Sequence, residues 1–124
     1  MQVEFYNQAS QANALPFSAA VKAGEFVFIS GQVATGEDGK IIAGDIDAQT
    51  RQTLLNVERA LAMAGCTLRD VIKVTVWLQH AGDFSEFNRA YAEFFPGAKP
   101  ARSTTQAPLM VESRIEIEAI AVKR

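Results

Sequence analysis

Side chains near the end of the chain repeat with a period of two. In residues 114–123, RIEIEAIAVK, an apolar residue stands at every odd position from 115 to 121. Such alternation puts one row of side chains on each face of a β-strand, and the apolar row must be buried against other elements. The opposite row carries Arg114, Glu116, Glu118 and Ile120. A chain with this strand is expected to build a sheet that is covered on one face.

The same period occurs earlier in the chain. Residues 70–79, DVIKVTVWLQ, predict a strand whose apolar face is formed by Ile72, Val74, Val76 and Leu78. Residues 17–30 predict two strands around a turn at Gly24 and Glu25. The pair Asp38-Gly39 predicts a further tight turn.

A short strand is also predicted at residues 102–105, because the proline before it favours extended backbone. Arg102 and Thr104 would then point the same way. If this strand lies beside the C-terminal strand, these two side chains can converge with a carboxylate. From the residues alone, two interpretations stay open. Either Arg102 binds a ligand, or it pairs with Glu116 or Glu118 across the sheet.

Two stretches change to a helical period of 3.6. Asp45 or Asp47 can cap the first helix, and Gly65 can close it. Its apolar positions recur at spacings of three and four: Leu54, Val57, Leu61 and Ala64. This is the longest helix that the sequence predicts.

The second helix follows the strand at 70–79. Asp83 is the predicted cap, Glu86 stands at the reciprocal capping position, and Pro96 terminates the helix. An aromatic stripe repeats along it, made of Phe84, Phe87, Tyr91 and Phe94. Because an amphipathic helix must bury such a face, the stripe is interpreted as core.

These elements predict an α+β sandwich, in which two helices cover one face of a sheet. The length of 124 residues suits a single domain spanning residues 1–124. The uncovered face would mix apolar and charged side chains, namely Lys73, Thr75, Trp77, Glu116, Glu118, Ile120 and Val122. Such a surface is typical of an interface between subunits. We therefore expect a homo-oligomer.

Composition disfavours several classes of function. Apolar residues make up 48% of the chain and charged residues 21%, the balance of a globular protein. No apolar run approaches the ~20 residues of a membrane span, so no membrane association is expected. The N-terminal residues show no export signal, and we expect a cytoplasmic protein. A net charge of -2 disfavours nucleic acid as a partner.

Few residues suit metal or nucleophilic chemistry. The one cysteine, Cys66, is interpreted as a buried thiol at a helix end, and the one histidine, His80, as a solvated turn residue. One residue of each kind cannot supply the clustered ligands of a zinc site, so no metal site is expected. The GxSxG, P-loop and GxGxxG signatures are absent.

Six segments carry a resemblance over nearly the whole chain. They are SGQV at 30–33, RQTLLNVERALAMAG at 51–65, VIKVTVWL at 71–78, FNRAYAEFF at 87–95, PARST at 100–104 and IEIEAIAV at 115–122. Taken together, they resemble the reactive-intermediate deaminases, the RidA or YjgF family. The resemblance implies a chorismate-mutase-like α+β fold with a mixed sheet and a homotrimer with clefts between subunits. It also implies hydrolysis of enamine or imine intermediates to 2-keto acids and ammonia.

The resemblance assigns candidate site residues. It implies that Arg102 is the essential arginine, that Glu116 is the site carboxylate, and that Thr104 stands where the family has cysteine or threonine. Gly31 would contact the substrate through its backbone, with Ser30 beside it. These residues are expected to meet in a cleft that binds a small imino or enamino acid.

The sequence departs from the family pattern in two places. Leu15-Pro16-Phe17 replaces the usual Gly-Pro-Tyr, so Phe17 would edge the cleft without a hydroxyl. The segment between Thr104 and Ile115 also differs from the usual form. Both changes affect the preferred side chain of the substrate and leave the arginine chemistry intact.

The expected mechanism needs no cofactor. A planar guanidinium can hold the carboxylate of a 2-imino acid by two parallel hydrogen bonds. Glu116 and Thr104 would position the attacking water, with Glu116 moving protons. Three alternatives stay open: a non-catalytic keto-acid-binding protein or holdase, a deaminase of aminomuconate-type intermediates, and a ribonuclease or translation inhibitor. The acidic charge balance disfavours the last of these.

Overall fold

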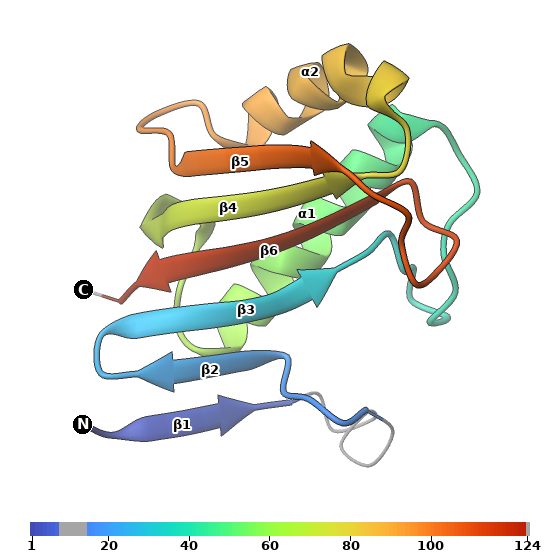
Figure 1. Ribbon diagram of the computed structural model, residues 1–124. Coiled ribbons are helices and arrows are strands. Elements are labelled where there is room, and N and C mark those ends of the chain that lie inside the picture. The colour runs from blue at the N-terminus through green and yellow to red at the C-terminus, as the bar shows by residue number, and fades with distance from the viewer. Residues whose placement is uncertain (8–14, 124) are drawn as a thin grey trace.

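The computed structural model describes residues 1–7 and 15–123. Its main elements, in chain order, are β1 (Val3–Tyr6), β2 (Ala20–Ala23), β3 (Phe26–Gln32), α1 (Ile46–Met63), β4 (Val71–Leu78), α2 (Phe84–Phe94), β5 (Ala101–Gln106) and β6 (Ile115–Val122). The strands form one six-stranded sheet in the order β1-β2-β3-β6-β4-β5 (Figure 1). Only β4 and β5 are parallel to each other, and every other neighbouring pair is antiparallel. The sheet is therefore mixed.

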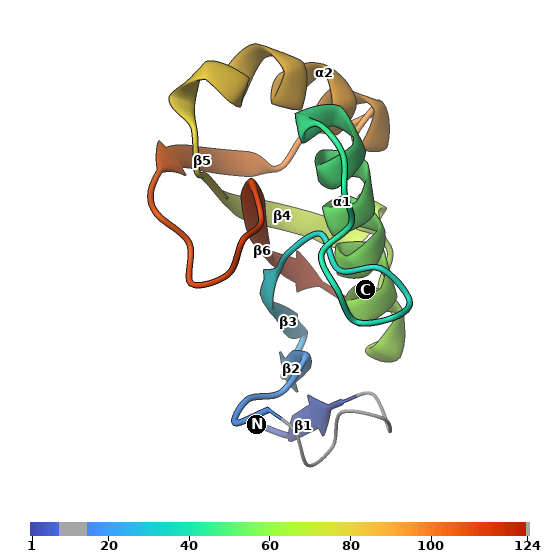
Figure 2. The same cartoon turned by 90° about the vertical axis from the view of Figure 1, so that its right-hand side faces the viewer.

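Both helices lie on the same face of this sheet (Figure 2). α1 packs against β6 and β3, and α2 packs beside α1 at the β5 end of the sheet (Figure 1). The core lies between the helices and the sheet and includes Leu54, Val57, Leu61 and the odd-numbered residues 115–121 of β6. This arrangement confirms the predicted α+β class with two helices on one face.

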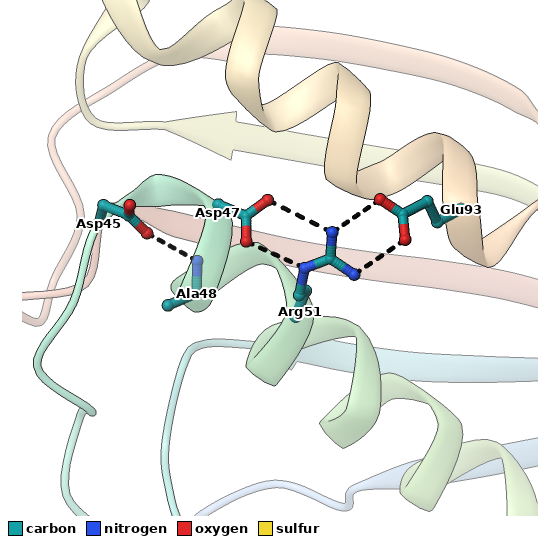
Figure 3. Close-up of polar contacts among 5 residues, drawn as sticks. All are labelled: Asp45, Asp47, Ala48, Arg51 and Glu93. Carbon is teal, nitrogen blue, oxygen red and sulfur yellow. Dashed lines mark hydrogen bonds and ion pairs between the residues drawn. The ribbon is translucent and has the colours of Figure 1, made fainter.

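The predicted boundaries of α1 are confirmed. The Asp45 side chain, not that of Asp47, caps the helix and accepts a hydrogen bond from the backbone nitrogen of Ala48 at 3.0 Å (Figure 3). Gly65 follows the helix with a φ of +76°, a left-handed conformation that glycine adopts without a steric penalty.

Asp47 takes part in an ion-pair network that joins the two helices (Figure 3). Arg51 lies 3.0 Å from Asp47 through Nε, and its two terminal nitrogens lie 2.7 and 3.1 Å from the carboxylate oxygens of Glu93 in α2. Arg51 lowers the pKa of the Glu93 carboxyl below its usual value. Asp47 and Glu93 together neutralise the charge of Arg51.

One residue of β4 was predicted on the wrong face. Ile72 is 40% exposed, whereas Val71 before it and Val74 after it are buried. The pairing of β4 with β6 shifts register between Val71 and Lys73. An irregularity of this kind adds a residue to one strand and reverses the local direction of side chains. Val74, Val76 and Leu78 are buried as predicted.

The aromatic stripe of α2 is buried, but with different members. Phe87, Tyr91 and Phe95 form a stack with ring centroids 5.4 and 4.8 Å apart. Phe84, the first residue of α2, is 45% exposed. Phe94 is partly buried against the core.

The predicted capping role of Asp83 is wrong. Asp83 holds the N-cap position of α2, but its side chain makes no capping hydrogen bond. It lies instead 3.4 Å from Nε of Arg114, across the gap to the start of β6. Competition from a nearby guanidinium explains why the local sequence signal failed here.

The face of the sheet opposite the helices carries the mixed side chains that the sequence predicts. Cross-strand register places Phe5, Val21, Phe28 and Ile120 in one row and Val3, Ala23, Phe26 and Val122 in the next. Toward β4 the face becomes polar, because Glu118 pairs with Thr75 and Glu116 with Trp77. The open face is therefore apolar over β1, β2 and β3 and polar near β4 and β5.

Three smaller observations concern the cysteine and the histidine, metal ligands, and membrane-spanning helices. Cys66 is buried, which raises the pKa of its thiol, and His80 is exposed, as predicted for both. Among residues 1–7 and 15–123, no group of three or more histidine, cysteine, aspartate or glutamate side chains is placed to hold a metal ion. No helix in this part of the chain combines the length and the apolar character needed to cross a bilayer.

Candidate functional site

The strand that holds Arg102, β5, has a different neighbour in the sheet from the one that the sequence suggested. β5 pairs with β4 in parallel, and β4 separates it from β6. Within that pairing, Arg102 stands opposite Val74, which is buried under the helices. Arg102 therefore points to the helix side, whereas Glu116 and Glu118 share the open face. The alternative in which Arg102 pairs with either glutamate across the sheet is wrong.

The guanidinium of Arg102 lies against α2. Its Nη2 donates a hydrogen bond of 2.8 Å to Oδ1 of Asn88, and its Cζ lies 4.7 Å from the ring centroid of Tyr91 and 5.0 Å from that of Phe87. A cation over aromatic faces is stabilised by the ring quadrupole. No ion pair joins Arg102 to an acidic side chain in the part of the chain that the structure describes. Among these residues of one chain, the positive charge of Arg102 is positioned but not neutralised.

Thr104 extends this group along β5. It lies on the same face as Arg102, since it pairs with Val76 in the core. Its Oγ1 is buried and finds no hydrogen-bond partner among the described residues. Thr104 also lines a hollow of about 260 Å³ together with Leu78 and Phe84. We call Asn88, Tyr91, Arg102 and Thr104 the arginine cluster.

Glu116 forms a second group on the open face with Gly31 and Glu118. An irregularity in β3 between Ile29 and Gln32 brings Gly31 beside the Glu116 side chain. A methyl group on Gly31 would overlap the Glu116 carboxylate, so glycine makes room for it. Burial, and then the charge of Glu118, raises the pKa of the Glu116 carboxyl. We call Gly31, Glu116 and Glu118 the glutamate cluster.

Ser30 and Phe17 lie near this second group. The Ser30 hydroxyl donates a hydrogen bond of 2.6 Å to the carbonyl of Ser18, so it ties the preceding segment to β3. Phe17 is 52% exposed and lines a hollow of about 580 Å³ that Gly31 also lines. Phe17 and Gly31 are thus brought together, while the Ser30 hydroxyl is engaged by the backbone.

The two clusters lie on opposite faces of the sheet within one chain. Within one chain, Arg102 and Thr104 share a face and Glu116 does not, so the convergence of all three in a cleft between subunits stays a prediction. Sequence reasoning also missed the roles of Asn88 and Tyr91. Their spacing of three on a helix, which puts both on one face, was the available signal.

Comparison with known proteins identifies the family. The family model described as Endoribonuclease L-PSP matches residues 7–123, which is most of the chain. The chain belongs to this family, also known as RidA/YjgF. The resemblance inferred from the sequence motifs is confirmed.

Individual relatives of this RidA/YjgF chain carry different names. A RutC family protein of Pyrococcus horikoshii is 49% identical over 110 residues, which cover 87% of each chain. A mouse protein named 2-iminobutanoate/2-iminopropanoate deaminase is 40% identical, covering 87% of this chain and 82% of its own. The crystal structure of E. coli TdcF with bound serine has a TM-score of 0.88 at 34% identity, covering 98% of this chain and 100% of that one. The family is therefore shared with relatives of which one, the mouse protein, is named for an imine deaminase activity.

Proposed function

We propose that this RidA/YjgF protein hydrolyses 2-imino acids, and their 2-enamine tautomers, to 2-keto acids and ammonia. The observation that carries the proposal is Arg102, a half-buried guanidinium with aromatic and amide contacts and no carboxylate partner among the described residues. A guanidinium of this kind matches a planar carboxylate, which every 2-imino acid carries. The mouse relative that is named an imine deaminase supports the same reaction class.

The proposed site is shared between two copies of the chain. One chain holds Arg102 and Glu116 on opposite faces of its sheet, so a site that uses both needs Arg102 of one copy and Glu116 of another. The apolar part of the open face supplies a surface for that contact. Such an interface joins two different surfaces, which form a closed ring when the rotation between copies allows it, and we propose that three copies close into a homotrimer.

Substrate binding comes first in the proposed mechanism. Two N–H groups of Arg102 hold the carboxylate of the substrate and leave the adjacent imine carbon in a fixed place. The Thr104 hydroxyl is buried and has no hydrogen-bond partner among the described residues. It can therefore form a hydrogen bond, as donor or as acceptor, with a water or with the substrate nitrogen. Fixing both reactants removes much of the entropic cost of the encounter.

Water addition and ammonia release follow. The water oxygen bonds to the imine carbon while the water gives one proton to Glu116, and Glu116 passes that proton to the imine nitrogen, which forms a carbinolamine. The carbinolamine hydroxyl then gives its proton to Glu116, and Glu116 passes it to the amino nitrogen. The carbon–nitrogen bond breaks, ammonia leaves, and the former hydroxyl oxygen becomes the keto oxygen. One water is consumed and one ammonia released. Burial and the charge of Glu118 raise the pKa of Glu116, which makes it a better proton acceptor than an ordinary carboxylate.

A second candidate is a protein that binds 2-keto acids without turnover. The separation of Arg102 from Glu116 within one chain favours it, because Arg102 alone can bind a carboxylate. The net charge of -2 favours neither a ribonuclease nor any other nucleic-acid-binding role. We keep the cytoplasm as the proposed compartment.

Ammonia release tests the proposal. Imino acids are generated in place by an amino acid oxidase, with small, acidic and aromatic side chains, and ammonia is followed with and without the protein. We expect release above the spontaneous rate, and Arg102→Ala should abolish the increase. Release at the spontaneous rate for all three classes would contradict an enzyme. Stabilisation of the same protein by pyruvate in a melting experiment would then identify the binding candidate.

A further inference from the structure

We infer that Asn88 is a positioning residue that fixes the Arg102 guanidinium through an uncharged acceptor, so that the positive charge remains available to a substrate carboxylate. The inference rests on the proposed function and deepens it. It concerns the affinity of the site for a carboxylate and not the chemistry at the imine carbon.

The geometry of the arginine cluster supports a positioning role. Asn88 accepts one hydrogen bond of 2.8 Å from Nη2 of Arg102, and the Tyr91 ring, one helical turn further along α2, lies 4.7 Å from the guanidinium carbon. Phe87, adjacent to Asn88, contributes a second ring at 5.0 Å. One hydrogen bond fixes the direction of the fork and the rings support its plane. A guanidinium has five N–H donors, so most remain free for a ligand.

Arg51 shows what a neutralised arginine looks like in the same chain. Its guanidinium contacts the carboxylates of Asp47 at 3.0 Å and Glu93 at 2.7 Å (Figure 3). Glu93 and Asn88 both belong to α2 and each contacts an arginine from another element. α2 thus contacts Arg51 through the carboxylate of Glu93 and Arg102 through the amide of an asparagine. The amide gives a hydrogen bond but no opposite charge.

A purely structural role for Asn88 makes a different prediction. If the contact served stability alone, a carboxylate at position 88 would improve it, because hydrogen bonds between charged groups are stronger than neutral ones. If Asn88 preserves the charge of Arg102, the same carboxylate would occupy the guanidinium and repel the substrate. The substitutions Asn88→Asp and Asn88→Ala therefore separate the two roles.

The experiment measures KM and kcat for imine hydrolysis, the Kd for pyruvate, and the melting temperature of the full-length protein. We expect Asn88→Asp to melt at or above the wild-type temperature and to weaken carboxylate binding by about 10- to 100-fold, with a smaller change in kcat. Asn88→Ala should melt lower yet bind better than Asn88→Asp. The order of affinity would then differ from the order of stability.

Ser85→Asp is the matched control. It adds the same charge to an exposed position of α2, one turn before Asn88, and should change KM and Kd less than about twofold. Affinity that follows stability, with Asn88→Asp binding as well as the wild type, would overturn the inference. If the wild type binds pyruvate without turnover, the enzyme proposal fails and the Kd series alone decides the role of Asn88.

Discussion

Gly31→Ala should lower activity without lowering stability, because the atoms nearest to the added methyl group all belong to the Glu116 side chain. That methyl would overlap Oε2 of Glu116 and lie 3.0 Å from Cδ and 3.3 Å from Cγ. Ordinary contact distances of about 3.5 Å require the carboxylate to move by about 1 Å. Misplacement of a reacting group by that amount costs on the order of 100-fold in rate. We expect kcat/KM for imine hydrolysis to fall accordingly.

The fold should tolerate the same change. Gly31 is not among the glycines with a positive φ, so alanine fits its backbone, and the displaced group is the end of a flexible side chain. Alanine also restricts the unfolded chain, which stabilises by about 0.4 to 1 kcal/mol where the backbone is compatible. The free energy of unfolding should therefore change little. Gly97→Ala, which meets no atom within 4 Å, is the control. Unchanged activity of Gly31→Ala, or loss of activity together with the fold, would refute the reasoning.

Three further predictions concern single side chains. Arg102→Lys keeps the charge but loses the planar fork of the guanidinium, so kcat/KM should fall about 100-fold. The melting temperature should change only as much as the loss of the amide contact and the ring stacking requires. Near-normal kinetics would contradict the role of Arg102. Phe17→Tyr should shift the ratio of kcat/KM between large and small side chains, and identical ratios would remove Phe17 from selectivity. Glu116 has a raised pKa in the folded protein, so the stability tied to its protonated form is present below its ordinary value of 4.5 and is lost as pH rises through the folded pKa. Glu116→Gln should thus be inactive, yet gain stability relative to the wild type as the pH rises above 4.5 in urea unfolding; a difference independent of pH would contradict the assignment.

Local periodicity was sufficient to predict most elements of the fold. The cap at Asp45, the period of three and four in α1, and the alternation of β6 each depend on residues close together in the chain. Such local patterns predict the structure correctly because the apolar face of each element is the face that the fold buries. The irregular register at Val71 carries no local signal, so Ile72 was predicted on the wrong face.

The order of strands could not be read from the sequence. The pairing of β5 with β4 joins segments separated by α2, and nothing in residues 101–106 distinguishes that neighbour from β6. The pairing of β5 with β4 puts Arg102 under α2, on the opposite face of the sheet from Glu116. The family motifs predict which residues form the proposed site, and the topology puts Arg102 and Glu116 on opposite faces of the sheet of one chain.

Activity recovered by mixing two inactive variants tests the shared site most directly. Arg102→Ala and Glu116→Gln chains are unfolded and refolded together in equal amounts, so that the two kinds of chain assemble at random. If each site takes Arg102 from one copy and Glu116 from another, about a quarter of the sites regain both residues and the same share of wild-type ammonia release returns. Mixing Arg102→Ala with Arg102→Lys should restore nothing. Mixed assemblies no more active than the separate variants would contradict a site built from two chains.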